Sequence, residues 1–426
     1  MTVTNEILQD LKARGLVAQC TADDELAEHL SSGSRTLYCG FDPTADSLHI
    51  GSLVPLLVLK RFQLAGHKPL ALVGGATGLI GDPSFKTAER QLNTTDVVAS
   101  WIEKIKTQVS AFINVDDSET GAEVVNNLDW TQNMDVISFM RDVGKHFSVN
   151  AMIQKESVKQ RIEREGTGIS FTEFSYMLLQ SYDFAALNKE KNCTLQIGGS
   201  DQWGNITSGV DLSRRMNRAK VYGLTLPLVT KSDGTKFGKT ESGTIWLDAN
   251  KTSPYAFYQF WLNSSDADVY NYLRFFTFLS VEQINEIEQN DKTIQGRPEG
   301  QAILATEVTR LVHGEDGLVS AERITKALFS GDLSSLNEAD LAQLALDGLP
   351  STEVESASAS IIELLTQSEL ASSNRMAREF ITNGAVSVNG EKITDSSAVL
   401  TIEDALFGKY SLIKRGKKLF NLYLWK

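Results

Sequence analysis

The sequence is poor in cysteine, histidine and proline, and it has no long apolar run. Its three cysteines, Cys20, Cys39 and Cys193, are widely spaced and odd in number, so they predict neither a disulfide framework nor a zinc site. The apolar stretch at 70–81, LALVGGATGLIG, is too short and glycine-rich for a membrane span of about 20 apolar residues. The N-terminal residues MTVTNEILQDLKARG lack the apolar core of a signal peptide. We therefore expect a cytoplasmic protein that has no membrane contact.

The chain has a negative net charge, and its charged residues are unevenly distributed. A net charge of −13 argues against a protein that coats nucleic acid nonspecifically. Residues 372–426 hold nine Lys and Arg against five Asp and Glu, a net +4 that leaves −17 for the rest. A small basic module on an acidic body suits selective RNA contact by one part of the chain. The length of 426 residues predicts two or three globular domains.

Residues 38–52, YCGFDPTADSLHIGS, predict a buried strand, a tight turn and a helix. Pro43 ends the strand, and the all-round apolar run that follows predicts a buried helix from Ser47, with Asp46 or Ser47 as its N-cap. Free N–H groups at a helix start favour an anion such as a nucleotide phosphate. The turn places four polar side chains there: Asp42, Thr44, His49 and Ser52.

A second motif, KSDGTKFGKT at 231–240, is a glycine-rich loop that carries Lys236 and Lys239. Taken alone it is a solvated turn, and HIGS alone is a helix start with one buried histidine. Together and in this order the two segments resemble the HIGH and KMSKS signatures of class I aminoacyl-tRNA synthetases. With LVGGATGLIGDPS, GISFTEFSYMLLQSYDF and QIGGSDQWGNI, the likeness narrows to the bacterial tyrosyl-tRNA synthetases and runs from about Val17 to Lys426.

Strands that alternate with helices predict an α/β fold with a doubly wound parallel sheet, whose ligands bind at the carboxyl ends of the strands. The resemblance implies a Rossmann-type catalytic domain for ATP and tyrosine at 1–230, then the KMSKS-like loop and an α-helical domain at 231–330. Residues 331–356 are small and acidic, which predicts a linker or a lightly packed helical bridge. Residues 357–426 resemble a small α+β RNA-binding domain of the S4 type.

Three polar residues, Tyr176, Gln180 and Asp183, lie on one stripe of a predicted helix. Among Phe, Met and Leu neighbours, such a stripe either belongs to an ordinary packed helix with satisfied polar tips or points into a polar cavity. The resemblance favours a cavity for L-tyrosine, in which Asp183 and Tyr38 would bind the phenol hydroxyl. It assigns tyrosine binding also to Asp42, Asp82, Asn127, Tyr176, Gln180 and Gln202.

The segment TLQIGGSDQWGNI at 194–206 repeats the pattern of strand, glycine pair and helix start. Lys86 and Arg90 are four residues apart, and they are either solvated surface charges or, as the resemblance implies, a clamp for pyrophosphate. The resemblance assigns phosphate handling to Thr44, His49, Lys86, Arg90, Lys236, Lys239 and Thr240. It assigns the rest of the ATP site to Cys39, Gly51, Ser52, Gly199, Asp201 and Lys239.

The resemblance implies a ligase that activates L-tyrosine with ATP and transfers the tyrosyl group to the 3′ end of tRNA(Tyr). ATP with Mg²⁺ would be a substrate, no cofactor would be tightly bound, and the chain would form a homodimer. Contacts to tRNA are expected from the basic residues of the last domain: Arg375, Arg378, Lys414, Arg415, Lys417 and Lys418.

Two other functions fit parts of the pattern. A nucleotidylyltransferase of the same superfamily would use the same helix start, but it would not need the basic tail or the polar stripe. A non-catalytic RNA-binding relative would be expected to lose its phosphate-handling residues, and here they are present. One departure from the family pattern is Ser52, which stands where HIGH usually ends in His.

Overall fold

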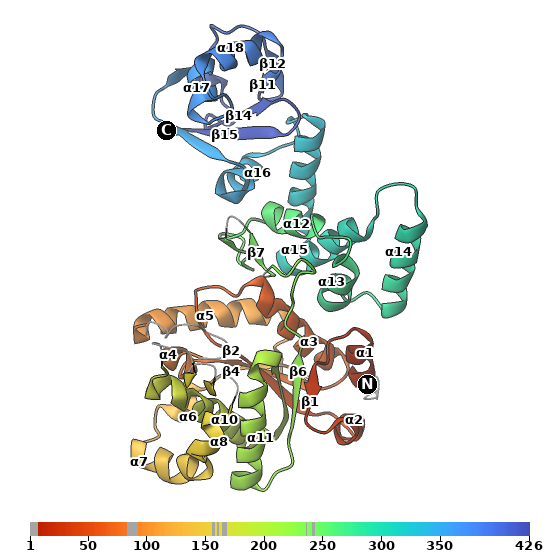
Figure 1. Cartoon of the computed structure of the whole chain (residues 1–426), viewed down its shortest axis with the longest axis vertical. Helices are drawn as coiled ribbons and strands as arrows, with labels where there is room; N and C mark the ends of the chain where they lie inside the picture. Colours follow the sequence, from red (N-terminus) through yellow and green to blue (C-terminus); the bar gives the residue numbers. More distant parts are fainter. Residues whose placement is uncertain are drawn as a thin grey trace. The chain divides into compact units, whose positions relative to one another are not determined.

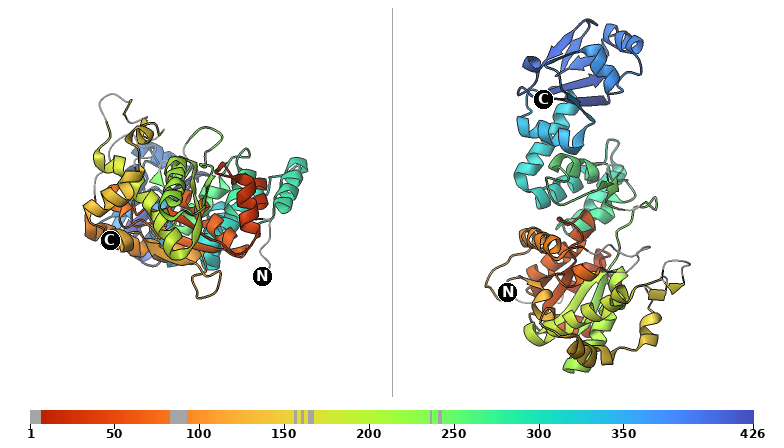
Figure 2. Two further views of the ribbon diagram at one scale, coloured as in Figure 1. Left: turned by 90° about the horizontal axis from the view of Figure 1, so that it is seen from below. Right: turned by 90° about the vertical axis from the view of Figure 1, so that its left-hand side faces the viewer.

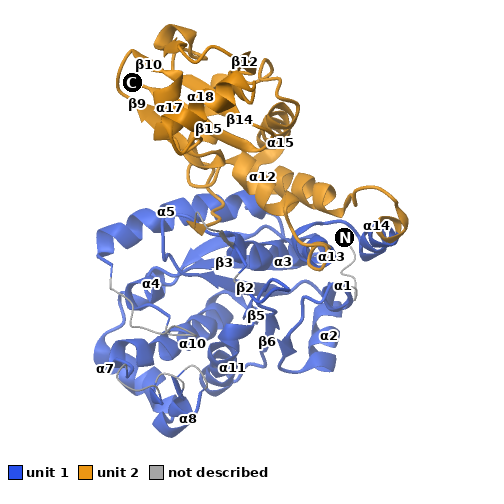
Figure 3. Cartoon of the chain, turned by 45° about the horizontal axis from the view of Figure 1, so that its top comes forward, with its two compact units in different colours: residues 1–238, 270–289 blue, residues 239–269, 290–426 orange. Residues whose placement is uncertain are grey.

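Figure 1 shows the computed structural model of the chain, and Figure 2 gives two further views of it. The structure describes residues 7–82, 93–155, 158–159, 162–163, 168–235, 237–240 and 243–426, without the side chains of 239 and 240. The chain divides into two compact units (Figure 3), unit 1 with residues 1–238 and 270–289 and unit 2 with 239–269 and 290–426. Within the described ranges, no helix has the length and apolar character that crossing a membrane requires.

Unit 1 is built on a six-stranded sheet. Its strands are β1 (Gln19–Cys20), β2 (Thr36–Phe41), β3 (Lys68–Val73), β4 (Glu123–Asn126), β5 (Cys193–Gly199) and β6 (Tyr222–Leu226). Their spatial order is β1-β6-β5-β2-β3-β4, and every neighbouring pair is parallel except β1 with β6. The chain runs outward from β2 to β4 and returns to β5 beside β2. The carboxyl ends of β2 and β5 therefore form the switch point at which doubly wound sheets bind ligands.

Helices cover both faces of this sheet. Figures 1 and 2 show α3 (Leu53–Leu64) and α5 (Thr95–Phe112) on one face and α10 (Phe171–Lys191) and α11 (Trp203–Asn217) on the other. The doubly wound α/β fold predicted from the sequence is confirmed. The shorter helices of this unit are α1 (Ile7–Ala13), α2 (Asp23–Ser31), α4 (Thr77–Ile80), α6 (Leu128–Thr131), α7 (Val136–Ser138) and α8 (Val149–Ile153).

The helix predicted from Ser47 begins later. Ile50–Ser52 form a 3-10 turn, and α3 itself begins at Leu53. Ser47 is not the cap because its hydroxyl donates to the carbonyl of the next residue at 2.9 Å. The cap is His49, whose Nδ1 accepts the backbone N–H of Gly51 at 3.0 Å. The turn between β2 and α3 is therefore longer than the sequence indicates.

Unit 2 starts with a short hairpin and continues with packed helices. Its first elements are β7 (Lys239–Thr240), β8 (Gly243–Thr244), α12 (Pro254–Leu262) and α15 (Gly300–Ser330), while α13 (Val269–Phe276) and α14 (Val281–Thr293) extend across the boundary between the units. Helices α12 and α15 pack along each other, and Phe257 and Trp261 of α12 are fully buried. Helix α15 is kinked at Gly314, whose φ of +71° is not helical.

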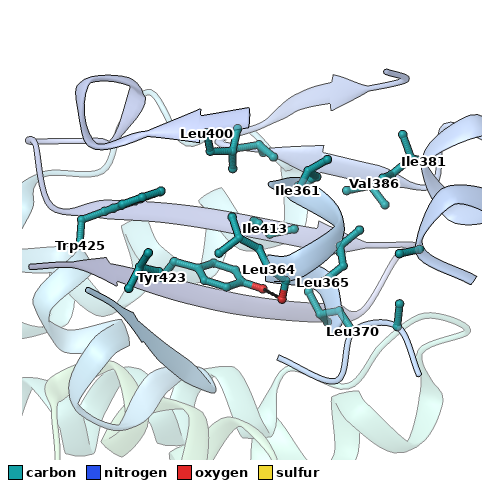
Figure 4. Close-up of a cluster of buried hydrophobic side chains, with 14 residues drawn as sticks. Ile361, Leu364, Leu365, Leu370, Ile381, Val386, Leu400, Ile413, Tyr423 and Trp425 are labelled. Carbon is teal, nitrogen blue, oxygen red and sulfur yellow. Dashed lines mark hydrogen bonds between the residues drawn. The ribbon is translucent and has the colours of Figure 1, made fainter. Parts of the chain in front are cut away.

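The C-terminal part of unit 2 packs two helices against a sheet. The sheet has the order β12-β11-β14-β15-β9, with β9 (Ser351–Val354), β11 (Val386–Val388), β12 (Glu391–Ile393), β14 (Tyr410–Arg415) and β15 (Leu419–Trp425). The helices are α17 (Ile361–Gln367) and α18 (Asn374–Thr382), and β10 (Ser358–Ser360) pairs with β13 (Val399–Thr401). Figure 4 shows Ile361 and Leu364 of α17 facing Ile413, Tyr423 and Trp425 of the sheet.

The segment 331–356 is more ordered than an open linker. It contains α16 (Glu338–Gln343) and β9, which adds to the C-terminal sheet as a parallel neighbour of β15. Leu341 and Leu344 are fully buried in a cluster with Leu412 and Leu422 of the sheet. Spaced leucines therefore hold the segment in place, although its small and acidic composition indicates an open chain.

The buried hydroxyl of Tyr423 joins the sheet to α17. It lies 2.8 Å from the carbonyl oxygen of Leu364 and 2.6 Å from Oγ of Ser368. We expect Tyr423→Phe to destabilise this part of the chain by about 1–2 kcal/mol, because the buried contacts of the hydroxyl with Leu364 and Ser368 are lost. Hydrogen exchange of the α17 amides measures the loss. Tyr410→Phe, on the same sheet but outside this cluster, is the control, and equal protection of α17 in both variants would contradict the prediction.

Candidate active site

A cavity of about 180 Å³ opens at the switch point between β2 and β5, with α10 as one wall. The strands contribute Tyr38 and Gly40 from β2 and Gln196 and Gly198 from β5. The polar side chains that line it are Tyr38, Asp42, Thr77, Asp82, Tyr176, Gln180, Asp183, Gln196 and Gln202. The stripe predicted on α10 therefore lines a polar cavity, as expected from the sequence.

A carboxylate lies at the buried end of this cavity. Asp183 is 2% exposed, and it accepts hydrogen bonds from Nδ2 of Asn127 at 3.0 Å and from Nε1 of Trp130 at 2.8 Å. Burial raises the pKa of Asp183 to about 7, against the two hydrogen bonds, which lower it. These two hydrogen bonds hold the carboxyl group in place, and its oxygens can accept a further hydrogen bond from another donor.

Three buried polar atoms in the cavity wall have no hydrogen-bond partner among the residues that the structure describes. They are the hydroxyl oxygen of Tyr38 and the side-chain carbonyl oxygens of Gln180 and Gln196. Burial and the nearby Asp183 hold the pKa of Tyr38 well above its usual value, so the phenol stays protonated. Unpartnered buried polar groups cost free energy, and in native proteins they call for an explanation such as a ligand.

A chain of hydrogen bonds leads from Asp183 to the mouth of the cavity. Asn127 donates through Nδ2 to Oγ1 of Thr77 at 3.0 Å, and Thr77 donates to Oδ1 of Asp42 at 2.6 Å. The other carboxylate oxygen of Asp42 accepts from the hydroxyl of Tyr176 at 2.6 Å. A Cβ on Gly74 would lie 1.9 Å from the Asp42 carboxylate, so only glycine fits there. The chain fixes five side chains relative to one another.

A larger cavity, of about 670 Å³, adjoins the first one. Both are lined by Gly40, Asp42, Asp82 and Gly199. The larger cavity is further lined by the turn before α3 and by the start of the glycine-rich loop, including Thr44, His49, Gly51, Ser52, Asp201, Gly234, Thr235 and Phe237. Its size and its position at the start of a helix suit a nucleotide next to a smaller ligand.

The structure brings most of the predicted residues together. Seven of the eight tyrosine-binding residues line the smaller cavity, and Asn127 lies behind it as a partner of Asp183. Cys39 lines the smaller cavity, whereas Thr44, His49, Gly51, Ser52, Gly199 and Asp201 line the larger one. Lys86, Arg90 and Lys236 lie outside the described residues, as do the side chains of Lys239 and Thr240 in β7.

Sequence reasoning missed two residues of the site. Gln196 is a polar residue in the middle of a buried strand, and that mismatch is the signal that points to a cavity. Trp130 follows the strand end at Asn127 by three residues and donates to Asp183, but nothing in its local sequence indicates this partner.

The six cations expected to contact RNA all lie on the C-terminal part of unit 2. Arg375 and Arg378 are exposed on α18. Arg415 also has an internal role, since it donates to the carbonyl oxygen of Leu370 at 2.6 Å and lies over the ring of Phe380. Lys414 lies over the ring of Phe420, and Lys417 and Lys418 are exposed in the turn between β14 and β15.

The raised pKa of Asp183 predicts a pH dependence of stability. Its folded value of about 7 exceeds its usual 3.8, so the folded state binds the proton more tightly. The resulting stabilisation is fully present below about pH 4 and is lost as the pH rises through 7. We expect Asp183→Asn to remove this decline between pH 5 and 8. Urea unfolding without ligands measures it, and parallel curves for the two proteins would contradict the assignment.

Family models match nearly the whole chain. Residues 31–330 match the class I tRNA synthetases (W and Y), and residues 340–423 match the SYY-like C-terminal domain of tyrosine-tRNA ligases. A tyrosine-tRNA ligase of Aliivibrio fischeri (strain MJ11) is 82% identical over 426 residues, covering 100% of both chains.

A tyrosine-tRNA ligase of Chromobacterium violaceum is 62% identical over 420 residues, covering 99% of each chain. Among solved structures, a C-terminally truncated mitochondrial tyrosyl-tRNA synthetase of Aspergillus nidulans is 30% identical, with a TM-score of 0.69, and covers 76% of this chain and 94% of its own. The chain therefore belongs to the tyrosine-tRNA ligases, a family of class I aminoacyl-tRNA synthetases.

Proposed function

We propose that the smaller cavity binds L-tyrosine with its phenol hydroxyl between Asp183 and Tyr38. The observation that carries this proposal is the pairing of a buried carboxylate with a buried, unpartnered hydroxyl at one end of the cavity. A phenol donates one hydrogen bond and accepts another, so it satisfies both groups. Phenylalanine would leave both unpaired, and tyrosyl-tRNA synthetases are known to reject phenylalanine in this way without editing.

The other end of the amino acid would face the larger cavity. Tyr176, Gln180 and Asp82 supply acceptors for its ammonium group, and Gln202 supplies a donor for its carboxylate or carbonyl oxygen. Gln202 is already oriented, because its Nε2 donates to the carboxylate of Asp82 at 2.7 Å. The carboxylate of the substrate would thus lie where the two cavities meet.

ATP would occupy the larger cavity with its α-phosphate next to that carboxylate. Thr44 and His49 line the cavity at the turn before α3, where they would contact the phosphates. Gly199 and Asp201 line it where β5 ends, and they would contact the ribose. Gly51, Ser52 and Cys39 would complete the surroundings of the nucleotide. The pyrophosphate would be neutralised by the side chains of Lys86, Arg90, Lys236 and Lys239, together with Thr240.

The reaction follows from this placement in two steps. A carboxylate oxygen of tyrosine attacks the α-phosphorus, so that tyrosyl-adenylate forms and pyrophosphate leaves. The terminal ribose hydroxyl of tRNA(Tyr) then attacks the tyrosyl carbonyl and AMP leaves. Neither step needs a covalent intermediate with the protein. The reaction would therefore be accelerated by the positioning of the two reacting groups and by hydrogen-bond donors to the negative charge that develops on the phosphate oxygens.

Mg²⁺ would enter with ATP and reduce the negative charge of its phosphates. The described residues contain no group of three or more His, Cys, Asp or Glu side chains that would hold a metal ion. A magnesium ion that binds with a nucleotide is usually held chiefly by phosphate oxygens and water. Asp42 and Asp82 line both cavities, and their carboxylates are the oxygen donors that would approach it.

We also propose a homodimer that works in the cytoplasm and contacts tRNA through its basic C-terminal residues. Large apolar side chains on α7, α8 and the start of α10 are exposed, among them Val136 at 70%, Ile137 at 72% and Phe171 at 70%. A group of exposed large apolar side chains on neighbouring segments favours an interface between copies of the chain. A nucleotidylyltransferase or a non-catalytic relative is disfavoured, because the full-length relatives are ligases.

Tyrosine-dependent exchange of pyrophosphate into ATP tests the proposed activation step. We expect exchange with tyrosine and none with phenylalanine or tryptophan, because only a phenol satisfies both Asp183 and Tyr38. Parallel assays of the three amino acids on one preparation provide the comparison. Exchange with phenylalanine at the tyrosine rate would refute the assignment of the cavity.

Ser52 tests the nucleotide contact at the helix start. It lines the larger cavity, and a histidine there would extend a donor toward the ribose. We expect Ser52→His to accelerate adenylate formation by about two- to tenfold, the value of one added hydrogen bond, and to leave tyrosine affinity unchanged. Single-turnover kinetics measure both quantities. An unchanged or lower rate would show that position 52 makes no productive contact with the nucleotide.

A further inference from the structure

The turn between β2 and α3 is irregular, and two of its residues are buried just before His49. Ser47 is 4% exposed and Leu48 is 5% exposed. A buried backbone N–H outside a helix or sheet requires a partner from elsewhere. For Leu48 that partner is the side chain of Gln108 on α5, whose Oε1 accepts the N–H at 2.8 Å. The two residues are 60 positions apart in the sequence.

Gln108 holds the turn at a second point. Its Nε2 donates to Oγ of Ser47 at 2.9 Å, so one amide side chain spans both sides of the peptide bond between Ser47 and Leu48. The next residue is His49, which lines the larger cavity and caps the following 3-10 turn. Two hydrogen bonds to one planar amide fix both the position and the tilt of the backbone that leads into His49.

One other side chain of α5 reaches this turn. Lys104 forms an ion pair with Asp46 at 3.0 Å, but Lys104 is 57% exposed. An exposed pair of this kind is screened by water and contributes little. The amide of Gln108 is therefore the stronger of these polar contacts between α5 and the turn.

We propose that Gln108 is a positioning residue for adenylate formation. It does not line either cavity, so it acts through Ser47 and Leu48 on the placement of His49. This proposal rests on the proposed function, in which the turn before α3 contacts the phosphates of ATP. A shift of about 1 Å in a catalytic group can reduce a rate by about 100-fold, so the loss should affect the chemical step.

The test compares four variants in single-turnover adenylate formation, with separate titrations of tyrosine and ATP. Gln108→Leu removes both hydrogen bonds at similar size, and Ser47→Ala removes one. Gln108→Glu keeps an acceptor for Leu48 and offers the hydroxyl of Ser47 a second acceptor, so it is the rescue variant. Lys104→Ala, one turn earlier on α5, is the matched control.

We expect Gln108→Leu to lower the saturated rate by about 10- to 100-fold and to leave the tyrosine Kd within about twofold. Ser47→Ala should give a smaller loss, Gln108→Glu should stay within about fivefold of the unchanged protein, and Lys104→Ala should match it. A purely structural role would lower the thermal midpoint or weaken tyrosine binding without this selective loss of rate. If Gln108→Leu fails to fold, the test rests on the rate of Ser47→Ala, which should fall, and on the rate of Gln108→Glu, which should stay near that of the unchanged protein.

His49→Ala separates this proposal from the proposed function. If His49→Ala is slow while Gln108→Leu and Ser47→Ala keep the full rate, the turn acts on ATP but Gln108 does not position it, and the proposal is overturned. If His49→Ala also keeps the full rate, the assigned role of the turn is overturned instead. If Gln108 positions His49, Gln108→Leu should also lower the saturated rate far less in the His49→Ala background than in the unchanged protein, because both changes act on His49.

Discussion

The buried carboxylate of Asp183 is the constraint on which the rest of the site depends. A carboxyl group at 2% exposure is tolerated only with strong partners, and Asn127 and Trp130 supply them. Asn127 also holds Thr77, and Thr77 holds Asp42 at the junction of the two cavities. The carboxylate that we propose to bind the phenol is thus connected, through the neutral side chains of Asn127 and Thr77, to the carboxylate at the junction of the two cavities.

The sheet explains why the two cavities meet at one place. β2 and β5 are neighbours in space although about 150 residues separate them, and their carboxyl ends carry Gly40 and Gly199, which line both cavities. Glycine at these strand ends lets ligands approach the backbone closely. A carboxylate and an α-phosphate placed on either side of this junction are brought together by binding alone, which is the main catalytic resource of a reaction without a covalent enzyme intermediate.

Local patterns predicted the doubly wound fold and the polar stripe on α10, whereas most of the other candidate site residues came from the family resemblance. Partners that lie far apart in the sequence were not predictable. The stripe of Tyr176, Gln180 and Asp183 was readable because helical spacing puts these residues on one face. The start of α3 was misplaced because the 3-10 turn Ile50–Ser52 precedes it, and the cap of that turn is His49, which is not among the residues that usually cap helices. Trp130 was missed because its contact depends on how α6 meets α10 in three dimensions. The order of 331–356 likewise depends on leucines that only the folded sheet brings together.

Binding calorimetry of tyrosine and phenylalanine, without ATP, tests whether Asp183 and Tyr38 together bind one phenol hydroxyl. We expect the unchanged protein to bind tyrosine far more tightly than phenylalanine. Tyr38→Phe should lower the ratio of the two affinities about tenfold, because it removes one of the two hydrogen bonds. An affinity ratio that Tyr38→Phe leaves unchanged would contradict the account, because the selectivity would then have another source.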